Sequence, residues 1–161
     1  YFKEETLEKS ARQYGWTLID DSNRKDMFMD MIRQMDMSYS YKPVLIKAIL
    51  LYADERGRIK LEDIVSYFKT YYEGRRSAGL TVEKKNSIFA KGGYTDKEAE
   101  RNILTNPFKR FEDMQMLRHT KTLGIIQVDE SVWKRLSKEE KIEIEKICNE
   151  KLELYYETIT G

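Results

Sequence analysis

The sequence has one cysteine, one histidine and two prolines among its 161 residues, and it has no long apolar run. The single thiol, Cys148, cannot form an internal disulfide or a cysteine cluster for a metal ion, which fits a reducing, cytoplasmic compartment. His119 has no second histidine with which to bind zinc, so we interpret it as a structural or surface residue. No stretch approaches the roughly eighteen apolar residues of a membrane span, so we expect no membrane partner.

Motifs for phosphate-binding loops and nuclease centres are also missing. Gly92-Gly93 is not followed by a Lys-Ser/Thr pair, so the chain has no ATPase loop. Glu83-Lys84-Lys85 has the spacing of a metal-dependent nuclease, but such a site also needs an aspartate on a neighbouring strand. The nearest upstream candidate, Asp63, falls in a helix pattern. We therefore expect no catalytic residue, no cofactor and no metal in this chain.

The net charge of +1 conceals an uneven distribution along the chain. Residues 74–124 hold 11 basic and 6 acidic side chains, whereas residues 1–73 hold 12 and 13, and residues 125–161 hold 6 and 9. A polyanion is therefore expected to meet the middle third, although the pI of 7.9 is below the value above about 9 typical of a dedicated nucleic-acid-binding domain. The candidate phosphate contacts are Arg75, Arg76, Lys84, Lys85, Lys91, Lys97, Arg101, Lys109, Arg110, Arg118 and Lys121.

Hydrophobic periodicity predicts four helices in the first half of the chain. Residues 4–14 and 24–35 are amphipathic, and the second segment has a methionine-rich face that either fills the core or docks on a partner. Residues 41–54 are apolar nearly all round, which is typical of a central helix covered on several sides. Residues 61–72 place apolar side chains at steps of three and four, as in an amphipathic helix.

Capping signals predict three further helices in the second half, the last of them long and acidic. The signals are Thr95 with Glu98, Asn106 with Pro107, and Ser137 with Glu140. Residues 115–128 read as a β-hairpin with a polar turn at 120–122, and residues 58–60 as a short extended segment. The stretch from Glu73 to Gly93 is rich in glycine and basic residues, and we expect a basic, mobile loop there.

A helix, a short extended segment, a helix and a later hairpin are the layout of a winged helix. We therefore predict a mainly α fold with a small β-hairpin: a winged-helix-like core with added N-terminal helices and a long C-terminal helix. Residues 1–35 are expected to form a helical arm or the tail of a preceding domain, and residues 36–161 the winged-helix-like domain. The chain starts at Tyr1, so we interpret it as part of a longer polypeptide.

Several segments between residues 24 and 157 carry a resemblance to a known module. They are the run from Met37 to Ala48, the turn Gly57-Arg58-Ile59, the segment from Asn106 to Phe111, Trp133-Lys134-Arg135-Leu136, and Tyr155-Tyr156-Glu157. Together they resemble the winged-helix-like C-terminal module of prokaryotic superfamily-two DEAD/DEAH-type helicases and of restriction-like nucleases from mobile elements and phage defence. The resemblance implies a role in handling nucleic acid and assigns no catalytic residue.

Two functions are compatible with the sequence. In the preferred one, the chain is a non-catalytic accessory module that contacts phosphates through the basic loop, the outward helix face and the wing, with DNA a better candidate than RNA. In the alternative, it is a protein-interaction or scaffolding domain that docks on the preceding domain of the same polypeptide or on another partner. If the parent protein hydrolyses ATP, it does so outside these residues.

Overall fold

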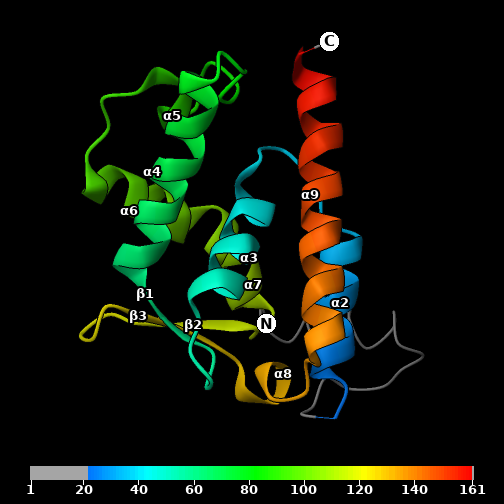
Figure 1. Cartoon of the computed structure of the whole chain (residues 1–161). Helices are drawn as coiled ribbons and strands as arrows, with labels where there is room; N and C mark the ends of the chain where they lie inside the picture. The colour runs from blue at the N-terminus through cyan, green and yellow to red at the C-terminus, as the bar shows by residue number, and fades with distance from the viewer. Residues whose placement is uncertain (1–21, 161) are drawn as a thin grey trace.

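The computed structural model describes residues 22–160, so the helix predicted at 4–14 lies outside the described residues. Most of the helices lie on one side of a small sheet, above it in Figure 1. The elements are α2 (Arg24–Arg33), α3 (Tyr41–Tyr52), β1 (Arg58–Lys60), α4 (Leu61–Ser77), α5 (Ile88–Lys91), α6 (Asp96–Thr105), α7 (Pro107–Asp113), β2 (Leu117–Thr120), β3 (Ile125–Val128), α8 (Glu130–Trp133) and α9 (Lys138–Thr160). None of the helices within residues 22–160 combines the length and the apolar character that a membrane crossing requires.

The three strands form an antiparallel sheet in the order β1-β3-β2. Ile126 of β3 lies opposite Ile59 of β1 and His119 of β2, so the second strand of the hairpin is central. This is the topology of a winged helix. A helix and a strand are followed by further helices and a hairpin, and the second strand of the hairpin, β3, pairs with β1. The predicted class, mainly α with a small hairpin, is confirmed, and the extended segment at 58–60 is the third strand of the sheet.

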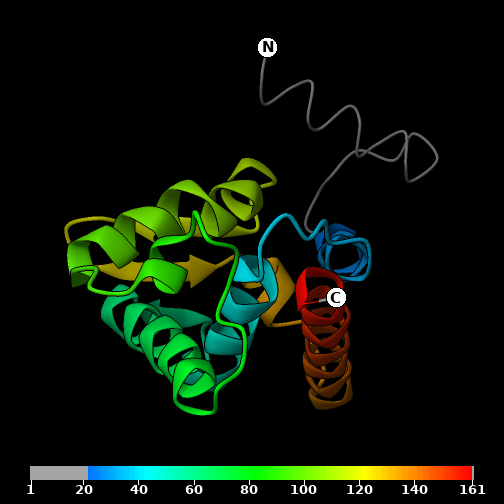
Figure 2. The same cartoon turned by 90° about the horizontal axis from the view of Figure 1, so that it is seen from above.

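Helix α3 is the centre of the core. It packs against α4, α7 and α9, and Figure 2 shows it between α4 and α9. Val44, Leu45 and Ala48 are completely buried. A helix that is covered on several sides needs apolar residues around its whole circumference, which explains the composition of this segment.

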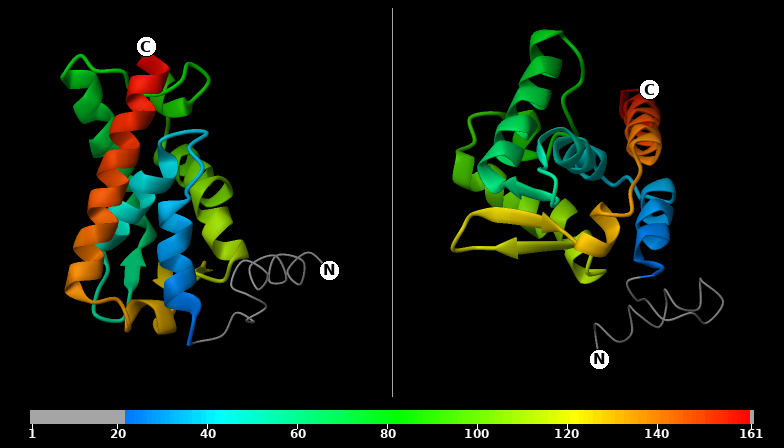
Figure 3. Two further views of the ribbon diagram at one scale, coloured as in Figure 1. Left: turned by 90° about the vertical axis from the view of Figure 1, so that its right-hand side faces the viewer. Right: turned by 60° about the horizontal axis from the view of Figure 1, so that its bottom comes forward.

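Helices α2 and α9 lie side by side, with α8 at their base (Figure 3). The methionine-rich face of α2 is mainly core: Met27, Met29 and Met35 are buried, while Met31 and Met37 are partly buried against the same core. Since α2 shares this core with the rest of the chain, it is part of the domain's packing; the predicted boundary after residue 35 stays a prediction.

The capping signals in the sequence predicted where helices begin, whereas the apolar pattern of α4 ended before the helix does. Both predicted capping boxes form, with reciprocal hydrogen bonds between Thr95 and Glu98 and between Ser137 and Glu140. In contrast, α4 continues to Ser77, beyond the end of its apolar pattern at residue 72. The segment predicted to be a loop from residue 73 therefore starts with a helical turn and contains the short helix α5.

Candidate nucleic-acid interface

The outward face of the sheet gathers basic side chains from two distant parts of the sequence. In the register of the sheet, Gln127 lies between Arg58 of β1 and Arg118 of β2. Residues directly opposite one another on neighbouring strands point to the same side, as do residues two apart in one strand. Arg58, Lys60 and Arg118 therefore share one face, and Lys121 follows in the turn. We call these four residues the basic sheet face.

Alternation along the strands produces this orientation. Ile59 is 3% exposed and packs into the core, whereas its neighbours Arg58 and Lys60 are exposed. Arg58 and Lys60 are not among the candidates predicted from the sequence. The signal that could have found them is the alternation of residues 58–60, combined with pairing of this segment to the predicted hairpin.

The basic sheet face has little internal compensation. Residues 58–60 and 117–128 contain no carboxylate at all. The Arg58 Nε lies 3.7 Å from the Asp54 carboxylate. Within residues 22–160, the side chains of Lys60, Arg118 and Lys121 make no hydrogen bond and no ion pair. Three uncompensated cations on one small surface favour the binding of an anionic partner.

Carboxylates border this face on two sides. Glu112, Asp113 and Asp129 line a pocket together with Arg118, and Glu112 lies 3.7 Å from Lys109 Nζ. The Asp113 carboxylate is 2.9 Å from Lys109 Nζ, and the Asp129 carboxylate is 3.2 Å from an Arg24 amino group. These two carboxylates are therefore already paired with other cations. On the side of α4 and α6, the surface beside Lys60 is limited by acidic residues, Glu62 and Glu100.

Helices α6 and α7 contribute less than the sequence predicted. Lys97 and Arg101 are exposed on α6, but the same helix carries Asp96, Glu98 and Glu100, so its net charge is −1. Its outward surface is therefore mixed in charge, unlike a basic recognition helix.

The two cations of α7 point to different surroundings. Lys109 is bound to Asp113 and lies 3.7 Å from Glu112. Arg110 faces a separate pocket beside α2. Helix α7 thus adds no continuous positive surface to the basic sheet face.

The cations at the end of α4 are used inside the fold. Arg75 Nε donates to the Thr81 carbonyl oxygen at 2.6 Å, and its guanidinium lies 3.4 Å from the centre of the Tyr156 ring. Arg76 donates to the Phe89 carbonyl oxygen at 2.6 Å. These two arginines hold the loop after α4 against the rest of the domain.

The lysines of the same loop are divided between inward and outward positions. Lys84 Nζ donates to the Ser38 carbonyl oxygen at 2.7 Å. Lys85 and Lys91 are exposed and have no ion pair within residues 22–160. The eleven cations predicted as phosphate contacts therefore lie in separate groups, and of these eleven only Arg118 and Lys121, in the hairpin, belong to the basic sheet face.

A buried carboxylate, Glu83, anchors the start of the segment from Met37 to Ala48. Glu83 is 6% exposed and accepts hydrogen bonds from the backbone N–H of Ser40 at 2.8 Å and of Lys84 at 2.7 Å. The hydroxyls of Ser40 and Tyr155 donate to the same carboxylate. Glu83 thus ties the N-terminus of α3 to α9, and both of its carboxylate oxygens accept hydrogen bonds from groups within the fold.

Tyrosine hydroxyls surround this carboxylate. Ser40 Oγ lies 2.6 Å from the Tyr72 hydroxyl, and the Tyr156 hydroxyl donates to the Val82 carbonyl oxygen at 2.7 Å. Burial raises the pKa of Tyr72, Tyr155 and Tyr156, and the charge of Glu83 adds to the effect. We call Ser40, Tyr72, Glu83, Tyr155 and Tyr156 the buried hydroxyl cluster; all five side chains are buried.

The single cysteine and the single histidine of the sequence both pack against other parts of the fold. Cys148 is buried in α9, and burial raises the pKa of its thiol to about 12. His119 lies edge-on to the Phe108 ring at 6.2 Å. In the part of the chain that the structure describes, no three His, Cys, Asp or Glu side chains come together in a way that could hold a metal ion. Comparison of the chain with protein-family models, curated proteins and solved structures finds no match.

Proposed function

We propose that the chain is an accessory nucleic-acid-binding module that contacts backbone phosphates through the basic sheet face. The observation that carries this proposal is that four cations share one face and turn of a winged-helix sheet whose strands contain no carboxylate. In the larger protein that the sequence resemblance implies, a prokaryotic helicase or a restriction or defence protein, the module positions nucleic acid for chemistry carried out by another domain.

The charge pattern supports recognition of phosphates rather than of bases. Lysine and arginine contacts with phosphates supply affinity without sequence information. The mixed charge of α6 offers no basic helix for the major groove. We therefore expect weak, sequence-independent binding, with a dissociation constant on the order of 10⁻⁴ to 10⁻⁶ M at physiological salt. The sequence resemblance favours DNA over RNA, so a DNA duplex is the first ligand to test.

The decisive experiment measures binding of a short, fluorescently labelled DNA duplex by anisotropy at low salt. The triple variant Lys60→Ala, Arg118→Ala, Lys121→Ala is expected to weaken binding at least about 100-fold, because three phosphate contacts are lost. A matched control, Lys85→Ala, Lys91→Ala, Arg101→Ala, removes the same charge from exposed cations elsewhere, and it is expected to change binding by about threefold or less.

Two outcomes contradict the proposal. Equal weakening by both triple variants means that net charge, not the basic sheet face, attracts the duplex. Absence of binding at low salt favours the protein-interaction function instead. A matched RNA duplex measured in parallel tests the preference for DNA.

A further inference from the structure

One stripe of helix α3 stays uncovered, although the helix is apolar around its circumference. Leu51 is 63% exposed and Tyr52 is 48% exposed, whereas Val44, Leu45 and Ala48 of the same helix are buried. Helices α4 and α9 pack against α3 and stand on either side of it (Figure 1). Exposed apolar residues on a central helix indicate a surface that another chain covers.

A groove follows this stripe between the C-terminal halves of α4 and α9. Lys47, which precedes Leu51 by one turn of α3, lies in its lining. Tyr71 and Leu80 line it on the α4 side, and Leu152 lines it on the α9 side. Since Leu80 is 53% exposed, the groove has apolar surface that is open to solvent.

The apolar surface continues toward the start of α9. The rings of Tyr52 and Tyr67 meet edge-on at 6.3 Å. Burial raises the pKa of Tyr67 and the nearby Glu145 carboxylate adds to the effect, so Tyr67 of α4 faces α9. Ile142 is 61% exposed and precedes Asn149 of the groove by seven residues, which puts it on the same side of α9. We call the groove, together with Leu51, Tyr52, Tyr67 and Ile142, the interhelical face.

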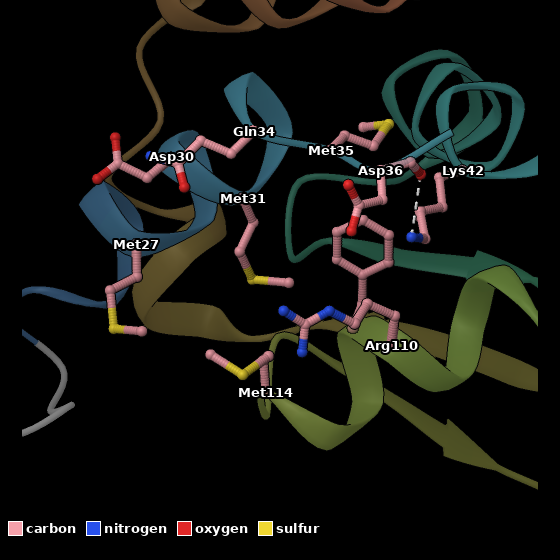
Figure 4. A pocket seen from close by; sticks show the side chains of 10 residues that line it. Met27, Asp30, Met31, Gln34, Met35, Asp36, Lys42, Arg110 and Met114 are labelled. Carbon is pink, nitrogen blue, oxygen red and sulfur yellow. Dashed lines mark hydrogen bonds between the residues drawn. The ribbon is translucent and has the colours of Figure 1, made fainter. Parts of the chain in front are cut away.

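The hollow beside α2 has a different character. Figure 4 shows that it is surrounded by two carboxylates and two cations, those of Asp30, Asp36, Lys42 and Arg110. Met35 and Met114 in the same lining are buried. Charged groups over a buried apolar layer leave little apolar surface for a partner, so the interhelical face is the stronger docking surface.

The size of the interhelical face matches that of a protein interface. Helix α4 has 17 residues, which corresponds to a length of about 25 Å. Three helices of about 10 Å diameter, α4, α3 and α9, lie side by side over this length and present roughly 800 Å². One partner contributes about the same area, 800 Å², to a standard stable interface.

The charges of the interhelical face are balanced. The groove is lined by two cations and two carboxylates, those of Lys47, Arg75, Glu153 and Glu157. Glu145 and Lys146 of α9 add one charge of each sign. Within residues 22–160, Lys47, Glu153 and Glu157 make no ion pair. A face with both signs in equal number disfavours a polyanion, whereas a two-fold interface meets its own copy and needs both signs.

We propose that the interhelical face binds a second copy of this chain in a two-fold symmetric dimer. The exposed flank of α9, with Ile142, enters the groove of the other copy and covers Leu51 and Tyr52 there. Lys47 of each copy lies opposite carboxylates on α9 of the other. Because the same face serves both copies, association ends at the dimer. This inference goes beyond the proposed function, since it involves neither phosphates nor the basic sheet face.

Sedimentation equilibrium of the whole chain, without nucleic acid, tests the proposal. A monomer–dimer equilibrium is expected with a dissociation constant tighter than about 10⁻⁴ M, because the face has the standard area but includes charged residues. A chain that stays monomeric at about 500 µM contradicts the proposal, whichever other partner then covers the groove. Assembly beyond the dimer contradicts it as well, since a two-fold interface is closed.

Two leucines with the same exposed fraction provide a matched pair of variants. Leu51→Lys is expected to weaken dimerisation at least about 100-fold, because an unpaired charge replaces an apolar side chain twice in the two-fold interface. Leu154 is also 63% exposed, but it lies five residues after Asn149 and therefore on a different side of α9. Leu154→Lys is expected to change dimerisation by about threefold or less. Equal effects of the two substitutions overturn the proposal.

Cross-linking locates the interface independently of substitutions. A carbodiimide joins lysine amines to carboxylates that are in contact, and a mixture of ¹⁵N-labelled and unlabelled protein identifies the links between copies. Mixed-isotope links are expected between Lys47 and the α9 carboxylates Glu145, Glu153 or Glu157. Mixed-isotope links confined to other surfaces contradict the proposal. The triple variant of the basic sheet face is expected to dimerise normally, so failure of the nucleic-acid proposal and failure of this one are distinguishable.

Discussion

The end of α4 and the three-stranded sheet both carry several cations, but the cations of α4 are directed into the fold and those of the sheet point away from it. Arg76 donates to the Phe89 carbonyl oxygen at 2.6 Å, and Arg75 lies over the Tyr156 ring. Lys60 and Arg118, in contrast, have no acceptor within residues 22–160. The two regions show that a basic residue supplies binding charge only where the fold leaves it without an internal acceptor.

The largest effect on stability is expected in the buried hydroxyl cluster, which lies beside the inward-directed cations of α4. Glu83→Ala leaves the backbone N–H of Ser40, the backbone N–H of Lys84 and the Tyr155 hydroxyl without their acceptor. We expect a loss of about 3 kcal/mol in the free energy of unfolding, because buried donors without partners are costly. Chemical denaturation measures it, with Lys85→Ala as the exposed neighbouring control. A loss below about 1 kcal/mol would show that Glu83 does not hold α3 to α9.

The same cluster, together with Tyr41 whose ring packs against Tyr72, predicts sensitivity to alkaline pH. Burial raises the pKa of Tyr41 to about 12, and it raises the pKa of Tyr72, Tyr155 and Tyr156 above the ordinary value of about 10. A hydroxyl whose pKa is raised on folding contributes stability that is complete below pH 10. This stability is lost as the pH rises from about 10, where the unfolded chain ionises, through the folded value near 12 for Tyr41.

We therefore expect cooperative unfolding between about pH 10 and 12. Circular dichroism and tyrosinate absorbance, recorded on the same samples, are expected to change together. Ionisation of all tyrosines near pH 10 with the helix signal unchanged contradicts the assignment of these hydroxyls to an enclosed cluster.

A smaller difference in stability is expected between variants of one cation at the end of α4 and one cation of the basic sheet face. Arg76→Ala is expected to cost about 1.5 kcal/mol, because the Phe89 carbonyl oxygen loses a charge-assisted hydrogen bond. Lys121→Ala is expected to change stability by less than about 0.5 kcal/mol, since the side chain makes no contact that the fold needs. Thermal denaturation of the two variants is the measurement. Equal costs would remove the distinction between inward-directed and outward-directed cations.

The fold was largely predictable from the sequence because its signals are local. Capping boxes, the apolar circumference of α3 and the alternation in the hairpin each depend on neighbouring residues, and each appears in the structure as expected. The third strand was predicted as an extended segment, but its pairing with β3 joins residues about 67 positions apart in the sequence, as Ile59 opposite Ile126 shows.

The candidate site was less predictable because it depends on contacts between distant residues. Periodicity does not reveal that the Phe89 carbonyl oxygen lies within reach of Arg76, or that Asp113 pairs with Lys109. A count of charges along the sequence therefore does not separate cations that bind acceptors within the fold from cations that are free to bind a ligand. Lys60 was missed since it falls outside the basic middle third of the sequence.

The most direct test of the account is the salt dependence of duplex binding. Three phosphate contacts predict that the logarithm of the association constant falls with the logarithm of salt concentration with a slope of about −2.7, or roughly 40-fold between 50 and 200 mM. The Lys60→Ala, Arg118→Ala, Lys121→Ala variant is expected to lose most of this slope, while the Lys85→Ala, Lys91→Ala, Arg101→Ala control retains it. A sheet variant that keeps the full slope contradicts the claim that the basic sheet face holds the nucleic acid.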